Sequence, residues 1–183
     1  FAKTAIINKA VKDEIKKLFP LAPLHNPANY LGIEVAEKIF TQAQQVAVFD
    51  TAFHQTMPPV AFRYALPEIF YTELGIRVYG FHGTSHKYVA EQAARYLNKP
   101  ESKIITVHLG NGCSMAAVRN GQSIDTSMGF GPLSGLIMGT RSGDIDPSVV
   151  FHLINQLGYD PEQVNMLLNK RSGMLGLTGH SDM

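Results

Sequence analysis

The sequence predicts an α/β fold, and two observations support this. Apolar residues recur at helical spacing in several segments, and compact apolar runs of strand length lie between them. Gly, Pro and Asn residues separate these segments and mark the turns. The 183 residues, 45% of them hydrophobic, are enough to bury one good core, or one domain and part of another.

The first fifty residues are predicted to hold two helices and one strand. Apolar residues at helical spacing predict helices over 11–18 and 29–40. The apolar run 46–49 predicts a buried strand ending in Asp50, and ligands collect at the carboxyl ends of strands in open α/β sheets. Turn-forming residues at 51–59 then predict a change of direction and a domain boundary near Asp50.

A helix, a strand and a longer helix are expected next, over 67–74, 78–81 and 83–97. Pro67 is expected in the first turn of the first helix, and Gly83-Thr84-Ser85 is expected to cap the second. The predicted buried face of the longer helix consists of four residues, Val89, Ala93, Ala94 and Leu97.

A strand over 103–109 and a hairpin of 113–119 with 122–126 are expected after these helices. Asn120-Gly121 between the hairpin strands suits a tight turn with positive φ angles. The glycine-rich stretch 127–145 predicts a long loop, and loops of this kind are usually functional or disordered.

Two further helices are predicted at 147–157 and 161–169. Each is entered through an Asp-Pro pair, with Asp146 or Asp160 as the cap and proline in the first turn.

Composition favours small-molecule partners. Lys and Arg number 16 against 15 Asp and Glu, and no run of like charge predicts a nucleic-acid or membrane surface. Cys113 is the only cysteine, so no intrachain disulfide is possible, and a reducing, cytoplasmic location is expected. No apolar run approaches the ~20 residues of a membrane span. The chain runs from Phe1 to Met183 without a terminal tail, and we expect a fragment of a longer protein.

The histidines form the first candidate constellation. Five of them lie at strand ends or beside turn residues: His25, His54, His82, His86 and His108. One such histidine alone is more often structural than catalytic. Together, beside glycine turns with accessible amides, they predict an anion site.

Two backbone motifs could hold phosphate. Gly110-Asn111-Gly112 follows a strand, and glycines let main-chain amides approach oxygens closely. The alternative is a simple bend into the hairpin. The segment 82–86 offers the amides of a helix N-terminus and two imidazoles, and its alternative is an ordinary helix cap.

Charged residues complete the candidates. Arg141 lies among glycines and could neutralise a phosphoryl group, or it could simply pair with Asp144 or Asp146. Asp50 could hold Mg²⁺ through water or orient a carboxylate, or it could be a turn residue. The sequence contains no P-loop, protein-kinase or G-x-S-x-G signature and no metal-spaced Cys/His cluster, so phosphate chemistry here needs another architecture.

These motifs, taken together and in order, resemble the acetate kinase family. The matching segments are 21–27, 48–58, 79–86, 108–112, 125–130 and 138–147. The resemblance implies the ribonuclease-H-like two-domain α/β fold of the acetate and sugar kinase, Hsp70 and actin superfamily, incomplete here. It implies that 1–50 is the remainder of the N-terminal domain and 51–183 the first part of the C-terminal domain.

The resemblance also implies roles for individual residues. The catalytic residues would be Asp50, His82 and Arg141, with Asp50 also near the metal, indirectly, and with His25 and His108 supporting the transition state. ATP phosphates would meet His108, Gly110, Asn111 and Gly112, and Asp182 would belong to the adenosine pocket. The acyl pocket would consist of Leu24, Phe81 and Pro132.

The implied activity is reversible, direct in-line phosphoryl transfer from ATP, with Mg²⁺, to acetate, with propionate as a second candidate, in a cytoplasmic homodimer. One alternative is a propionate kinase of propanediol or threonine breakdown, and another is a non-catalytic scaffold or dimerising module. Gly131 and Ser134 depart from the family pattern, which has Thr and Glu there. The family's amino-terminal phosphate loop, second arginine and metal-binding glutamate are not in this sequence.

Overall fold

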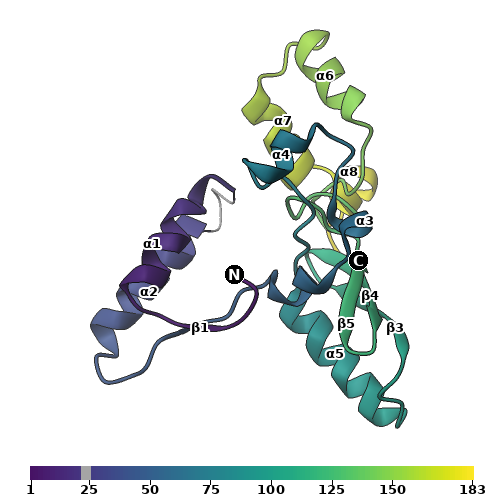
Figure 1. The fold of residues 1–183 in the computed structure, drawn as a ribbon. Helices are drawn as coiled ribbons and strands as arrows, with labels where there is room; N and C mark the ends of the chain where they lie inside the picture. Colours follow the sequence, from purple (N-terminus) through teal and green to yellow (C-terminus); the bar gives the residue numbers. More distant parts are fainter. Residues whose placement is uncertain (22–25) are drawn as a thin grey trace.

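The computed structural model describes residues 1–21 and 26–183 and confirms the α/β prediction. In Figure 1 the first elements, β1, α1 and α2, lie beside a longer body that contains the other labelled elements. Helix α5 and the strands β3, β4 and β5 form one end of that body, and α6 and α7 lie toward its other end. Within the described ranges no helix is long and apolar enough to cross a bilayer.

The amino-terminal part consists of two helices and two very short strands. These are β1 (Ala5–Ile6), α1 (Lys9–Lys17), η1 (Phe19–Leu21), α2 (Asn26–Ile39) and β2 (Val46–Ala47). Both predicted helices are confirmed, and each begins a few residues earlier than expected. The Asn8 side chain caps α1 by accepting from the amide of Val11 at 3.0 Å. Lys12 and Glu37 join the two helices in an ion pair of 2.7 Å.

The strand predicted at 46–49 is present only as β2, and the prediction that it is buried is wrong. The side chains of Val46 and Val48 are 48% and 63% exposed. Strand β2 pairs with β1 alone, as an antiparallel ribbon of two residues each, and β1 was not predicted. An apolar run marks a strand that can be buried, but a two-stranded ribbon has no second layer of its own to cover it.

The chain then turns at residues 50–51 and enters short helices. These are η2 (Ala52–Thr56), α3 (Pro59–Phe62) and α4 (Glu68–Thr72). The change of direction and the helix expected at 67–74 are confirmed, although Pro67 occupies the N-cap position rather than the first turn.

The strand predicted at 78–81 is wrong. The amides of Tyr79 and Gly80 both donate to the carbonyl of Gly129, at 3.0 and 3.2 Å, so no regular ladder forms. Gly80 has φ of +68° and His82 has φ of +57°, which takes the backbone out of the extended region twice within three residues. The apolar pattern could not show these two left-handed positions.

Helix α5 (Gly83–Tyr96) is confirmed, but its cap and its buried face differ from the prediction. His82 is the N-cap residue, without a side-chain cap, and Gly83-Thr84-Ser85 forms the first helical turn. The buried residues are Gly83, His86 and Ala90, whereas Val89 and Leu97 are 43% and 53% exposed. Ala93 and Ala94 are half-buried and share a face with His86 and Ala90, so the prediction was right for these two residues and wrong for Val89 and Leu97.

A sheet of three antiparallel strands lies against α5. Its order is β3 (Lys103–Leu109), β4 (Cys113–Arg119) and β5 (Gln122–Thr126). The three strands and the β4–β5 hairpin confirm the prediction, and the pairing of β3 with β4 was not predicted. Asn120 and Gly121 have φ of +52° and +76°, which confirms the predicted hairpin turn. Ala90, Ala116 and Val118 form one apolar cluster, with Phe53 packed against it. A second cluster consists of Cys113, Met128 and Met138, with Phe81 and Leu136 beside it.

The stretch 127–145 contains no helix or strand, as predicted, and three helices follow it. They are α6 (Pro147–Asn155), α7 (Pro161–Lys170) and α8 (Gly173–Thr178). The predicted Asp caps are confirmed: Asp146 accepts from the amide of Ser148, and Asp160 forms a capping box with Gln163. Helix α8 was not predicted, because its Gly-rich sequence has weak helix propensity.

Candidate active site

Four of the five histidines noted in the sequence gather between α5, η2 and β3. Ring centroids of His82 and His108 lie 4.0 Å apart and stacked, and His86 lies 6.5 Å from His82 and 6.4 Å from His108. His54 lies 5.8 Å from His86. His25 lies outside the described residues. The folded chain therefore places imidazoles from three separate elements in one cluster.

Asp50 anchors the start of α5. One carboxylate oxygen, Oδ2, accepts a hydrogen bond from the amide of His82 at 2.7 Å, and the Asp50 carbonyl accepts from the amide of Gly83 at 2.8 Å. A side chain at Gly83 would collide with that carbonyl oxygen. Asp50 is thus a helix-anchoring residue, and its Oδ1 receives no hydrogen bond from the described residues.

The His82 ring faces the glycine turn that follows β3. Its Nδ1 lies 2.8 Å from the Ser114 hydroxyl, which orients the ring. A Cβ at Gly112 would lie 3.2 Å from both Nε2 and Cε1 of His82 and 3.5 Å from Nη1 of Arg141. One imidazole nitrogen and one guanidinium nitrogen therefore converge on the space above Gly112, where glycine leaves room.

Arg141 forms no ion pair with Asp144 or Asp146. Its Nη1 donates to the carbonyl of Pro132 at 2.9 Å. The Asp144 carboxylate accepts from the amide of Gly135, and Asp146 caps α6. Among the described residues no acid lies within ion-pair distance of this guanidinium. Its positive charge is therefore available to an anion at the Gly112 space.

Burial favours the neutral form of three of these imidazoles, those of His54, His82 and His86, by lowering their pKa values. It lowers the pKa of His86 to about 4, with smaller contributions from His54, His82 and His108. Burial and then the neighbouring His108 lower the pKa of His82, and the Asp50 carboxylate opposes the shift. Burial also lowers the pKa of His54. Before an anion binds, Arg141 supplies the main fixed positive charge of the site.

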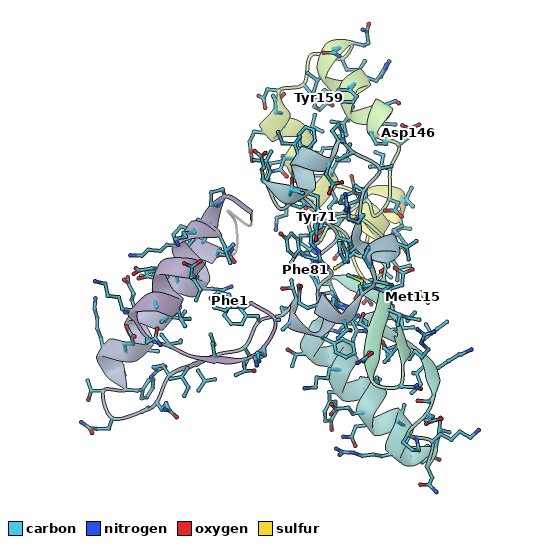
Figure 2. The ribbon with its side chains drawn as sticks, viewed as in Figure 1. Phe1, Tyr71, Phe81, Met115, Asp146 and Tyr159 are labelled. Carbon is cyan, nitrogen blue, oxygen red and sulfur yellow. The ribbon has the colours of Figure 1, made fainter. Side chains whose placement is uncertain are left out.

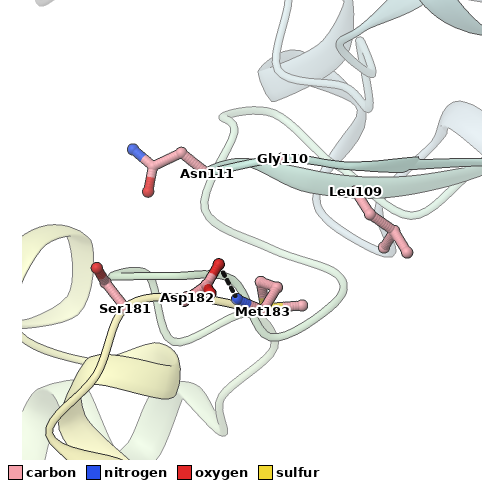
Figure 3. A pocket seen from close by; sticks show the side chains of 6 residues that line it. All are labelled: Leu109, Gly110, Asn111, Ser181, Asp182 and Met183. Carbon is pink, nitrogen blue, oxygen red and sulfur yellow. Dashed lines mark hydrogen bonds between the residues drawn. The ribbon is translucent and has the colours of Figure 1, made fainter.

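The turn at 110–112 lies at the edge of a pocket of about 480 Å³. The Gly110 amide donates to the carbonyl of Gly112 at 3.1 Å, so the segment is a tight turn as well as a bend into β4. The pocket is lined by six residues, Leu109, Gly110, Asn111, Ser181, Asp182 and Met183. Figure 3 shows Asn111 across from the segment that carries Ser181 and Asp182. Two of the predicted phosphate residues, Gly110 and Asn111, therefore share a pocket with Asp182, and His108 and Gly112 do not line it.

The predicted acyl pocket is only partly described. Phe81, labelled near the middle of the longer body in Figure 2, packs against the Cys113, Met128 and Met138 cluster. Pro132 is half-buried and is tied to Arg141 through its carbonyl. Leu24 lies outside the described residues.

Asp50 is a carboxylate of this site that could take part in holding a metal ion, since its Oδ2 accepts the His82 amide and its Oδ1 receives no hydrogen bond from the described residues. No group of three His, Cys, Asp or Glu side chains in the described ranges could hold a metal. Mg²⁺ commonly takes one or two carboxylates, waters and substrate phosphates. Asp50, with one carboxylate oxygen not engaged, fits that role.

The residues that sequence reasoning missed are hydroxyls. Ser85, Thr106, Ser114 and Ser123 each lie within hydrogen-bond distance of a histidine nitrogen in the cluster. Thr106, Ser114 and Ser123 are buried. The sequence did contain a signal for these residues. Thr106, Ser114 and Ser123 lie in strands otherwise rich in apolar residues, and a buried hydroxyl there needs a hydrogen-bond partner.

Comparison with known proteins decides the family. The sequence model of the Acetokinase family matches residues 1–183. The chain belongs to the acetokinase family. Among curated acetokinase relatives, the acetate kinases of Flavobacterium johnsoniae and Syntrophomonas wolfei are 63% and 58% identical to it over its whole length. The chain spans 46% of the length of each of these relatives.

Solved acetokinase structures share the fold. A propionate kinase from Francisella tularensis matches the whole chain with a TM-score of 0.97 and 53% identity, over 47% of its own length. The acetate kinase of Porphyromonas gingivalis matches the whole chain with a TM-score of 0.92 and 47% identity, over 46% of its length. The predicted family and fold class are therefore confirmed.

Proposed function

We propose that the complete protein transfers a phosphoryl group reversibly between ATP and a short-chain carboxylate, with acetate as the first candidate. The observation that carries this is the convergence of His82 Nε2 and Arg141 Nη1 on the space above Gly112. A guanidinium donor and an imidazole nitrogen that can take up a proton when an anion binds, at one open point next to a glycine turn, suit the oxygens of a phosphoryl group in transfer.

Arg141 would neutralise charge on the transferring group, because no acid pairs with it among the described residues. His82 would contact the same group from the other side of the Gly112 space, and His108, stacked on His82, would support it. Direct in-line transfer needs positioning and charge neutralisation rather than a covalent intermediate. We therefore assign no phosphorylated histidine.

The nucleotide would lie along the turn that follows β3. Gly110, Asn111 and Gly112, with His108, would contact the phosphates, and Asp182 would contribute to the adenosine pocket. The shared pocket of about 480 Å³ supports this placement. Asp50 would hold Mg²⁺ through water, and the ion would supply further neutralisation of the phosphates when bound. His25 is proposed for the same site from the family resemblance alone.

Propionate is the second candidate substrate. The propionate kinase structure from Francisella tularensis is 53% identical to the chain and matches it with a TM-score of 0.97. Leu24, Phe81 and Pro132 would line the acyl pocket. One methylene in an apolar pocket changes binding by about 1–3 kcal/mol, so we propose that both acids are used to different extents.

The remaining proposals concern organisation. We propose a boundary near Asp50 between the end of one domain, 1–50, and the start of the next, 51–183. The separation of the amino-terminal elements from the longer body in Figure 1 supports it. We also propose a cytoplasmic homodimer, on the family resemblance.

Hydroxylamine trapping of the acyl phosphate tests this function. The complete protein, given ATP, Mg²⁺ and acetate or propionate, is expected to form acyl hydroxamate, and Arg141→Ala is expected to lose at least 100-fold of kcat. Arg119→Ala is the matched control, because Arg119 is exposed at the end of β4 beside the hairpin turn. No turnover by the folded complete protein would favour the scaffold alternative, and equal losses in both variants would reject the role of Arg141.

A further inference from the structure

A chain of buried side chains runs behind His82. The His82 Nδ1 lies 2.8 Å from the Ser114 hydroxyl, and the same hydroxyl lies 2.7 Å from Nε2 of His86. On its other side, His86 Nδ1 lies 2.7 Å from the Thr106 hydroxyl, which donates to the carbonyl of Ala116 at 3.4 Å. Ser114, His86 and Thr106 are all buried. Each member therefore depends on its neighbours for hydrogen bonds.

The carbonyl at one end sets the direction of the whole chain. The Ala116 carbonyl can only accept, and Thr106 is placed as its donor at 3.4 Å; with its single hydroxyl hydrogen directed there, Thr106 accepts from His86 Nδ1. Burial keeps His86 neutral, with one ring hydrogen, so its Nε2 must accept from Ser114. Ser114 has then used its only hydrogen and can only accept from His82 Nδ1.

The other end of the chain favours the same direction. With its hydrogen on Nδ1, a neutral His82 presents the lone pair of Nε2 to the Gly112 space, where the Arg141 guanidinium also points. A lone pair beside a cation is electrostatically favourable, whereas an N–H there would be repelled. If an anion binds and His82 Nε2 takes up a proton, His82 Nδ1 still carries its hydrogen. Ser114, as an acceptor, remains a suitable partner for it.

We infer that Thr106, His86 and Ser114 form a positioning chain that holds the His82 ring with Nδ1 as the hydrogen-bond donor and Nε2 toward Gly112 and Arg141. His86 is thus a positioning residue that acts through Ser114, because its ring is buried and its two nitrogens are engaged within the chain. The importance of the His82 ring for turnover rests on the proposed function. The tautomer of that ring is inferred from the hydrogen bonds alone and does not depend on the proposed function.

The tautomer can be read without any substrate. In the ¹⁵N-histidine-labelled complete protein, long-range ¹H–¹⁵N correlation at neutral pH is expected to show His82 with a protonated Nδ1 and an unprotonated Nε2. A His82→Gln sample assigns the resonances. A neutral His82 with its hydrogen on Nε2 would overturn the inference, whatever the variants show.

Thr106→Val reverses the chain and separates positioning from packing. Without a hydroxyl at position 106, His86 loses the acceptor for Nδ1, moves its hydrogen to Nε2 and donates to Ser114, which then donates to His82 Nδ1. His82 is therefore expected to switch to the tautomer with hydrogen on Nε2. The kcat is expected to fall about 10-fold, because Ser114, now a donor, can no longer accept from a doubly protonated His82 ring. Thr106→Ser restores the hydroxyl and is expected to restore the parent tautomer and most of the lost kcat.

The outcomes separate this inference from the proposed function. An unchanged His82 tautomer in a folded Thr106→Val protein would overturn the chain even if the enzyme is active. A protein that shows the expected tautomers but forms no acyl phosphate would keep the chain and reject the function. If Thr106→Val does not fold, the parent spectrum alone still decides the direction.

Discussion

Strand β4 begins and ends at a glycine turn, and the two turns use glycine for different reasons. Gly121 has φ of +76° and nothing within 4 Å of the place where a Cβ would lie. Gly112 has no positive φ, but a Cβ there would meet the His82 ring and approach Arg141. Glycine is required at 121 by the backbone conformation and at 112 by the lack of room for a side chain. Open space beside a guanidinium and an imidazole is what an anion-binding site needs.

Gly112→Ala should produce the largest effect. The added methyl lies 3.2 Å from the His82 ring atoms, so either the ring moves or the space for a phosphoryl oxygen is lost. We expect kcat/KM for acyl-phosphate formation to fall at least 100-fold, since small displacements of catalytic groups have effects of this size. Thermal unfolding should change little. Full activity in this variant would contradict the proposal that the space above Gly112 receives the phosphoryl group.

Lowering the pH should reduce the free energy of unfolding, through the buried His86 that lies behind the Gly112 turn. The pKa of His86 is lowered to about 4 in the folded protein, from the ordinary 6.5. Between pH 6.5 and pH 4 the unfolded state therefore binds the proton more tightly, and stability falls as the pH is lowered through this range. The stability present at pH 7.5 should drop by about 2 kcal/mol at pH 5 from this residue.

Urea unfolding across pH measures this effect. His86→Gln should flatten the dependence between pH 7 and pH 5, whereas His152→Gln, at an exposed position in α6, should leave the slope unchanged. An equal slope in the parent and His86→Gln would show that this ring does not titrate as its burial predicts.

Gly121→Ala should affect only stability. An alanine with positive φ costs about 1–2 kcal/mol, and the free energy of unfolding in urea should fall by that amount. Activity per folded molecule should equal that of the parent, because the open space around Gly121 contains no candidate site residue. Lost activity here would remove the distinction between the two turns.

Gly110→Ala should show the smallest effect. Its Cβ would lie 3.5 Å from His108 Nε2 and from the carbonyl oxygen of Gly112, which is ordinary contact. A change of less than about 5-fold in kcat/KM is expected, below 1 kcal/mol in the barrier. A loss as large as that of Gly112→Ala would mean that the turn has no room for a methyl group at either glycine, against the spacing seen around Gly110.

Regular elements were well predicted because their signals are local. The hairpin at Asn120-Gly121 and the Asp146 and Asp160 caps depend on residues within a few positions of each other, and all are confirmed. The strand predicted at 78–81 failed because left-handed Gly80 and His82 leave no mark in an apolar pattern. The buried face of α5 was predicted only in part, because an apolar pattern could not include the buried His86.

The candidate site could be proposed but not assembled from the sequence. Asp50, His82 and Arg141 were chosen by local motif and family resemblance. The convergence of His82 and Arg141 on Gly112, and the contact of Asp50 with the His82 amide, require the folded structure. The Ser114 bridge between two histidines was missed, because it joins residues 28 and 32 positions apart in the sequence. Hydrogen-bond partners at such separations depend on the tertiary structure.

A crystal structure of the complete protein with acetyl phosphate tests the central claim most directly. The claim is that His82 and Arg141 together receive the transferring phosphoryl group above Gly112. The account predicts a phosphoryl group with oxygens within hydrogen-bond distance of both His82 Nε2 and Arg141 Nη1. A phosphoryl group bound elsewhere, with the space above Gly112 filled only by water, would contradict it.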